Sequence, residues 1–189
     1  MTPLLGFDGL PIADQIVLQQ FCRGPRANRP FALIHKAFEY FADTSPTAVA
    51  AFHNNRTVTY GKLEAAANVL SHKLLAYGLQ PRERVCLVVS RSIEMLVAII
   101  AILKCGCQYI PLDGKVVTDQ TLLHIVHDTA ARFILCLKEF RTKCSNYSDP
   151  GTQIQLIDGC VEDRTFPPKR LECSVKPTDG AYIIYTSGS

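Results

Sequence analysis

The chain has 189 residues and a formal net charge of +3; 48% of its residues are hydrophobic and 20% are charged. This length supports one sizeable hydrophobic core, and the composition is ordinary for a globular α/β protein and excludes disorder over most of the chain. Basic residues are interspersed with acidic ones, which argues against a nucleic-acid-binding protein or a protein of the membrane surface.

Targeting and membrane signals are not evident in the sequence. The amino terminus has neither a basic leader nor a long apolar run, which argues against a secretory signal. The longest apolar run, MLVAIIAIL, is too short to span a bilayer. The 8 cysteines lack the spacing of a secreted disulfide scaffold, so reduced thiols and a cytoplasmic location are expected.

The first predicted elements follow a leader. Residues 1–30 contain several glycines and prolines with little periodicity and are interpreted as a leader or linker, and residues 31–189 as the domain. Residues 31–42 predict a helix with Ile34, Phe38 and Phe41 on one face. Residues 48–60 predict a β-hairpin, because the Asn54-Asn55 pair in its middle tolerates the left-handed turn conformation.

The rest of the chain alternates between helices and strands. Residues 60–79 predict a long amphipathic helix that ends at Gly78. Further strands are predicted at 84–90, 107–112, 132–137, 152–157 and 181–186, and further helices at 92–104 and 118–129. Strands that alternate with helices indicate parallel βαβ units. The expected fold class is therefore α/β, with a mostly parallel sheet and helices on both faces.

The last predicted strand leads into a hydroxyl-rich turn formed by Thr186, Ser187, Gly188 and Ser189. Hydroxyls and glycine-permitted amides at the carboxyl edge of a sheet can converge on a phosphate. Neither a Gly-x-x-x-x-Gly-Lys-Ser/Thr loop nor a Gly-x-Gly-x-x-Gly turn occurs. Serine-rich turns are common after strands, so this tetrapeptide alone does not separate a phosphate site from an ordinary turn.

Three segments together carry a resemblance to a known family. TYGKL at 59–63, LKCGCQYIPLD at 103–113 and PTDGAYIIYTSGS at 177–189 resemble, in order and spacing, the first three core motifs of nonribosomal peptide synthetase adenylation domains. These domains belong to the adenylate-forming superfamily, with acyl-CoA synthetases and luciferases. The resemblance covers the chain from about Phe31 and implies the N-terminal subdomain of such an enzyme. Four residues depart from the motifs: Cys105, Gln108, Gly114 and Gly180.

The resemblance implies an activity and its cofactors. A complete enzyme would use ATP and Mg2+ to activate a small carboxylic or amino acid as an acyl-adenylate, and would transfer it to phosphopantetheine on a carrier domain in secondary metabolism. The third motif grips the β- and γ-phosphates of ATP, so Thr186, Ser187 and Ser189 would supply hydroxyls, and Gly188 would allow a close backbone approach. The first two motifs are interpreted as packing elements without a catalytic role.

The family's third motif continues as Thr-Gly-x-Pro-Lys-Gly, whereas this sequence stops at Ser189. The chain is therefore expected to be a fragment, inactive alone and without a tightly bound cofactor, and exposed apolar surfaces could cause self-association. The alternative is a non-catalytic truncated α/β module that acts as a protein-interaction or regulatory piece.

Other candidate residues have plainer interpretations. A metal pair formed by His124 and His127, beside Asp128, lacks a spaced third ligand, so a solvated helix face is preferred. Cys105 and Cys107 replace small core residues of the motif and are interpreted as buried thiols. Glu94 near a helix start is interpreted as structural, because the helix dipole favours an acid there.

Overall fold

A computed structural model describes residues 9–21, 24, 30–146, 151–172 and 174–186. The chain divides into two compact units, Met1–Pro30 and Phe31–Ser189. The first unit contains helix α1 (Ile12–Phe21), which the sequence analysis did not predict. The glycines and prolines that suggested a linker lie on either side of this helix, and Pro11 accepts hydrogen bonds from the amides of its first turn.

The second unit is built on a parallel sheet of four strands, in the order β4-β3-β5-β6. Its strands are β3 (Arg84–Val89), β4 (Gln108–Asp113), β5 (Phe133–Cys136) and β6 (Gln153–Leu156). The central strands β3 and β5 are buried over nearly their whole length, as expected for apolar strands that are covered on both sides.

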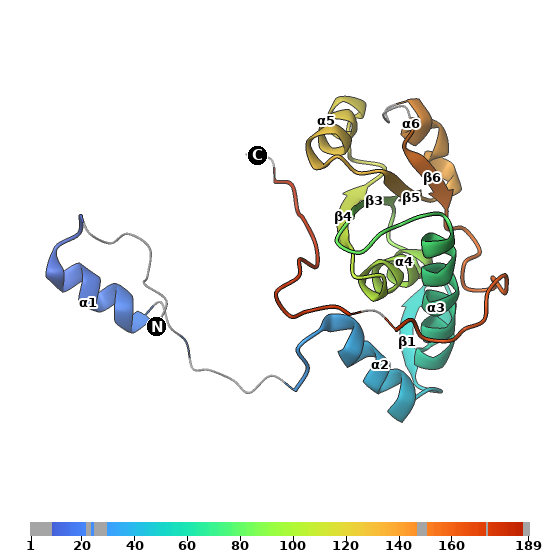
Figure 1. Cartoon of the computed structure of the whole chain (residues 1–189), viewed down its shortest axis with the longest axis horizontal. Coiled ribbons are helices and arrows are strands. Elements are labelled where there is room, and N and C mark those ends of the chain that lie inside the picture. Colours follow the sequence, from blue (N-terminus) through green and yellow to red (C-terminus); the bar gives the residue numbers. More distant parts are fainter. Residues whose placement is uncertain (1–8, 22–23, 25–29, 147–150, 173, 187–189) are drawn as a thin grey trace. The chain divides into compact units, whose positions relative to one another are not determined.

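Helices cover both faces of this sheet (Figure 1). The connection through α4 (Ile93–Lys104) leads from β3 to β4, and the connection through α5 (Asp119–Thr129) leads back past β3 to β5. Right-handed crossovers in opposite directions place their helices on opposite faces. Helix α3 (Tyr60–Ala76) packs with α4, and α6 (Arg141–Asn146) lies on the face of α5. The predicted α/β fold class is confirmed.

The predicted hairpin and the helix after it are confirmed. Strands β1 (Val49–His53) and β2 (Arg56–Thr59) pair antiparallel, and the two asparagines between them have φ values of 47° and 60°. Positive φ at both positions is typical of the tight turns that join hairpin strands. Thr59 then caps α3, because its hydroxyl accepts a hydrogen bond from the Lys62 amide.

Two regions differ from the sequence-based expectation. Helix α2 (Ile34–Thr44) buries His35, Glu39 and Ala42, whereas Ile34 and Phe41 are 53% and 45% exposed. Phe38, between them on the predicted face, is partly buried against the core. The helix buries polar residues because it packs on a polar cluster described below. Residues 138–146, for which no element was predicted from the sequence, form a 3-10 turn (Lys138–Phe140) and helix α6.

The hydrophobic core lies between the sheet and these helices. Its largest fully buried side chains include Leu63, Leu74, Leu87, Ile102 and Phe133, which come from α3, β3, α4 and β5. Within the described ranges, no helix combines the length and the apolar character needed to cross a membrane.

Candidate functional site

The segment before the predicted phosphate turn lies along the outer side of β4. Tyr182 forms a parallel bridge with Tyr109, the Tyr109 amide donates to the Ala181 carbonyl at 3.2 Å, and the Ile183 amide donates to the Tyr109 carbonyl at 3.0 Å. The segment therefore runs in the direction of β4, toward the carboxyl ends of the strands. Of the four predicted site residues, Thr186 is described and exposed, whereas Ser187, Gly188 and Ser189 lie outside the described residues.

The predicted strand at residues 181–186 is reduced to this single bridge, and the sequence of β4 gives a reason. Alternate residues of a strand face the same neighbour, so the outward-facing position after Tyr109 is Pro111. Proline has no amide hydrogen and cannot donate to an adjacent strand. The ladder between β4 and the segment therefore stops after one residue of β4.

Tyr185 attaches the segment to the next element of the fold. Its hydroxyl donates a hydrogen bond to the carboxylate of Asp128 in the last turn of α5, and its ring meets that of His124 edge-on at a centroid distance of 6.4 Å. Burial and the contact with Asp128 raise the pKa of Tyr185 to about 12. The hydroxyl therefore remains protonated and able to donate throughout the neutral range.

Two departures from the family motifs touch each other in this region. A Cβ atom at Gly180 would lie 2.7 Å from the side-chain carboxamide carbon of Gln108. Glycine at position 180 thus accommodates the larger residue at position 108. A similar relation explains Gly114, where a Cβ atom would lie 2.5 Å from the ring of Phe140, a side chain that is 7% exposed.

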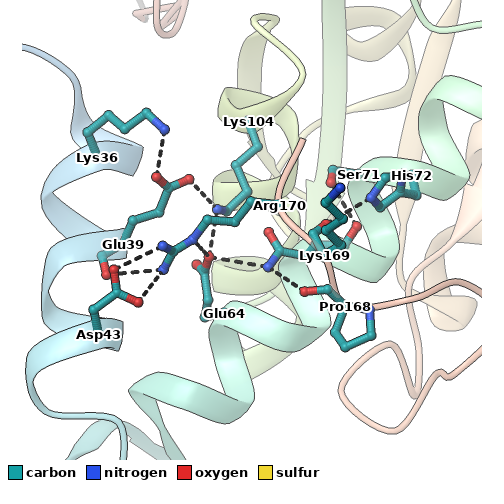
Figure 2. A network of polar contacts seen from close by, with 11 residues as sticks. Lys36, Glu39, Asp43, Glu64, Ser71, His72, Lys104, Pro168, Lys169 and Arg170 are labelled. Atoms are coloured by element: carbon teal, nitrogen blue, oxygen red, sulfur yellow. Dashed lines mark hydrogen bonds and ion pairs between the residues drawn. The ribbon is translucent and has the colours of Figure 1, made fainter. Parts of the chain in front are cut away.

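A second group of charged residues, of which Glu39, Glu64 and Lys104 are buried, lies at helices α2, α3 and α4 (Figure 2). Lys104, whose side chain is 2% exposed, contacts the carboxylates of Glu39 at 2.6 Å and Glu64 at 2.9 Å. Arg170, from the segment after β6, contacts Glu64 at 2.7 Å and both carboxylate oxygens of Asp43 at 2.9 Å. We call these five residues the Lys104 cluster.

The electrostatics of the Lys104 cluster favour a structural role. Burial alone would raise the pKa of Glu39, but hydrogen bonds from Lys104 and Lys36 outweigh it and lower this pKa. The neighbouring His35 is 5% exposed, and burial lowers its pKa to about 4. Each buried charge is thus paired, as burial requires, and Arg170 connects the segment after β6 to α2 and α3. Sequence analysis missed it, although a lysine ending the apolar run of α4 was a visible signal.

The other candidates are placed as follows. Cys105 and Cys107 are buried, with thiols directed at the carbonyls of Ser71 and Gln80, respectively. Glu94 pairs with Arg56 at 2.9 Å. The part of the chain that the structure describes holds no group of three His, Cys, Asp or Glu side chains arranged for a metal ion.

A surface pocket of about 260 Å³ lies elsewhere in the second unit. It lies between β2, the helix starts at Lys62 and Ile93, and the loop around Glu162. None of its lining residues comes from α5 or from residues 181–186. It is therefore separate from the segment that leads to Thr186.

Comparison with known proteins identifies relatives of the sequence. The family model described as AMP-binding enzyme matches residues 38–189. An adenylate-forming reductase of Coprinopsis cinerea is 33% identical over 186 residues, which cover 95% of this chain and 18% of that protein. The malpinin synthetase of Mortierella alpina is 35% identical over 183 residues, 96% of this chain and 2% of that protein. The chain thus spans less than a fifth of the length of either relative.

Solved structures share the fold. The nonribosomal peptide synthetase FmoA3, in a form with AMPPNP bound, superimposes with a TM-score of 0.78 at 24% identity, covering 94% of this chain and 18% of that one. The N-terminal subdomain of Klebsiella oxytoca NpsA gives a TM-score of 0.68 at 19% identity, covering 83% of this chain and 39% of that one. These likenesses establish the architecture.

Proposed function

The chain belongs to the AMP-binding enzyme family, and we propose that residues 31–189 form the N-terminal portion of an adenylation domain. The complete enzyme would activate a carboxylic or amino acid as an acyl-adenylate with ATP, for transfer to a phosphopantetheine thiol on a carrier domain. The observation that carries this proposal is the parallel approach of residues 181–183 to β4. Ligands of open α/β sheets bind at the carboxyl ends of the strands, where this segment leads.

The chemistry assigned to the segment is charge stabilisation. Hydroxyls of Thr186, Ser187 and Ser189, with the amides around Gly188, would donate to the β- and γ-phosphate oxygens of ATP. During adenylation, negative charge accumulates on the departing pyrophosphate, and oriented donors lower the free energy of that state. The exposed position of Thr186 is compatible with contact to a nucleotide.

The described residues do not provide a magnesium cage of their own, since no group of three metal-ligating side chains occurs among them. Mg2+ is commonly held by one or two carboxylates together with substrate phosphates. In the complete enzyme the ion would contact the phosphates of ATP. Phosphopantetheine and its carrier domain would engage after the acyl-adenylate has formed.

The chain by itself is proposed to bind ATP weakly and not to complete adenylation. Its relatives are more than five times longer, and the family's phosphate loop contains a lysine beyond the last residue of this sequence. A pyrophosphate-exchange assay on the isolated chain should therefore give no signal above background for any carboxylic or amino acid. Exchange at an ordinary enzymatic rate would show that this part of the proposal is wrong.

Nucleotide titration followed by NMR tests the phosphate contact itself. ATP and inorganic triphosphate should shift the amide resonances of residues 186–189, whereas AMP, which lacks the β- and γ-phosphates, should leave them unchanged. The Ser187→Ala variant should weaken the response, and Thr165→Ala, a substitution in the exposed loop after β6, should preserve it. If ATP at millimolar concentration shifts none of these resonances, the chain does not bind phosphate at this segment.

A further inference from the structure

The hydrogen bond between Tyr185 and Asp128 joins the residue directly before Thr186 to a helix whose position the core fixes. Leu122, Ile125 and Val126 of α5 are 0–1% exposed, and the Thr118 hydroxyl caps the start of the helix at the Thr121 amide. Packing of α5 in the core therefore fixes the position of the backbone at Asp128. In the segment itself Ile184 is 60% exposed, whereas Ile183 and the Tyr185 side chain are only partly buried against the core.

The location of Asp128 is unfavourable for an acid unless a donor is present. It lies in the last turn of α5, where the carbonyl end of the helix dipole repels a negative charge. No salt bridge of Asp128 occurs within the described ranges. Its carboxylate instead accepts the Tyr185 hydroxyl, and such charge-assisted bonds are stronger than neutral ones.

Backbone hydrogen bonds to β4 cannot attach the segment beyond Ile183. The ladder between the segment and β4 ends at Tyr109, because Pro111 has no amide hydrogen to offer. Beyond Ile183 the chain turns from β4 toward α5, where Tyr185 meets Asp128 and the ring of His124. A side-chain anchor thus follows the last backbone hydrogen bond of the segment to β4.

We propose that Asp128 and Tyr185 are positioning residues that hold Thr186, where the proposed phosphate-binding segment begins, in place for nucleotide phosphate. This inference rests on the proposed function, since it assigns a support to the same segment. Neither side chain contacts phosphate. The pair would fix the direction in which the chain leaves Tyr185, and so the location of the donors that follow.

Amide hydrogen exchange of the full chain tests the anchor without any nucleotide. Loss of one charge-assisted hydrogen bond should increase exchange of the Ile183 amide, which donates to the Tyr109 carbonyl, about tenfold in Tyr185→Phe and in Asp128→Ala. The double variant should exchange no faster than either single variant, because both remove the same bond. Asp128→Asn keeps an acceptor and should restore part of the protection. Asp119→Ala, at the other end of α5, should leave this segment unchanged.

The ATP titration, repeated on the same variants, connects the anchor to phosphate binding. Tyr185→Phe and Asp128→Ala should weaken ATP binding by the same factor, about tenfold, while the midpoint of urea unfolding stays that of the parent chain. A role in general stability would instead move the midpoint and leave ATP affinity unchanged, which would overturn the inference.

The two proposals fail differently. If amide hydrogen exchange were unchanged in Tyr185→Phe and Asp128→Ala, the proposal that this hydrogen bond holds the segment would be overturned, whatever the result of the ATP titration. If the parent chain did not bind ATP, the proposed function would be rejected and the phosphate role of the pair with it, whereas the exchange data would still establish or exclude the anchor.

Discussion

At the scale of single residues, departures from a family motif are explained by the side chains they meet. Gly180 leaves space for Gln108, and Gly114 leaves space for the ring of Phe140. Neither pairing could be predicted from the sequence, because the partners are far apart along the chain and no motif relates them. The substitutions therefore preserve packing and do not argue against membership of the family.

The Lys104 cluster gives a prediction for a buried charge. Lys104→Met keeps the side-chain length but removes the buried ammonium shared by Glu39 and Glu64, which then keep only Lys36 and Arg170, respectively, as cationic partners. Removing one partner of a buried pair costs about 3–5 kcal/mol when the other charge is left uncompensated, so the free energy of unfolding, measured with urea, should fall by at most about that amount. Lys36→Met removes the half-exposed partner of the same Glu39 and should cost at most about 1 kcal/mol. Equal stability of Lys104→Met and the parent would contradict a stabilising role.

The lowered pKa of His35 makes the folding stability of the chain depend on pH. Its pKa in the folded chain is about 4, below the ordinary value of 6.5, chiefly because of burial. Between these values the unfolded chain binds a proton that the folded chain excludes, so stability is full above about pH 6.5 and declines as pH falls toward 4. The loss attributable to His35 should be about 2–3 kcal/mol.

Urea unfolding at a series of pH values measures this dependence. His35→Gln should flatten the profile between pH 6.5 and 4, whereas His127→Gln, on the exposed face of α5, should leave it unchanged. A His35→Gln profile as steep as that of the parent would assign the acid sensitivity to other groups.

At the scale of elements, local signals were sufficient where one segment determines its own conformation. The Asn54-Asn55 turn and the Thr59 cap are examples, since short-range hydrogen bonds and φ preferences decide both. The buried polar residues of α2 could not be predicted because their partners, Lys104 and Arg170, come from distant segments. The last strand was overpredicted because Pro111 of β4, and not the segment itself, limits the pairing.

The end of α5 offers a prediction on backbone conformation. Ala130 follows this helix with φ 49° and ψ 40°, a left-handed conformation that costs a residue with a Cβ atom about 1–2 kcal/mol. Ala130→Gly should therefore stabilise the chain by about 0.5–1 kcal/mol, after the added flexibility of the unfolded chain is subtracted. Ala131→Gly, at the adjacent buried position, should destabilise it. Thermal unfolding of the pair checks the sign, and a lower midpoint for Ala130→Gly would contradict the strain.

At the scale of the whole molecule, the sequence predicted the family and the sheet, whereas the support of the candidate site required coordinates. Three motifs in register identified the adenylate-forming resemblance, which the family match over residues 38–189 confirms. The contact between Tyr185 and Asp128 joins residues 57 positions apart, so no local pattern links them. An acid in the last turn of a helix was the available hint, because its charge is unfavourable there.

Exposed apolar side chains predict association of the isolated chain. Val49 and Phe52 of β1 are 59% and 68% exposed, and exposed strands with apolar residues favour contacts between copies. Sedimentation velocity should therefore give an average mass that rises with concentration, and Phe52→Gln should reduce the rise. A single monomeric species at every concentration would contradict this expectation.

The Lys104 cluster also has a consequence for the order in which the chain becomes compact during synthesis. Arg170 and Asp43 are separated by 127 positions, and at roughly 5–20 residues per second a ribosome needs on the order of ten seconds to progress from one to the other. Until then, the carboxylates of Asp43 and Glu64 lack their guanidinium. The contacts of Arg170 with α2 and α3 can therefore form only after these helices have been synthesised, near the end of translation of this region.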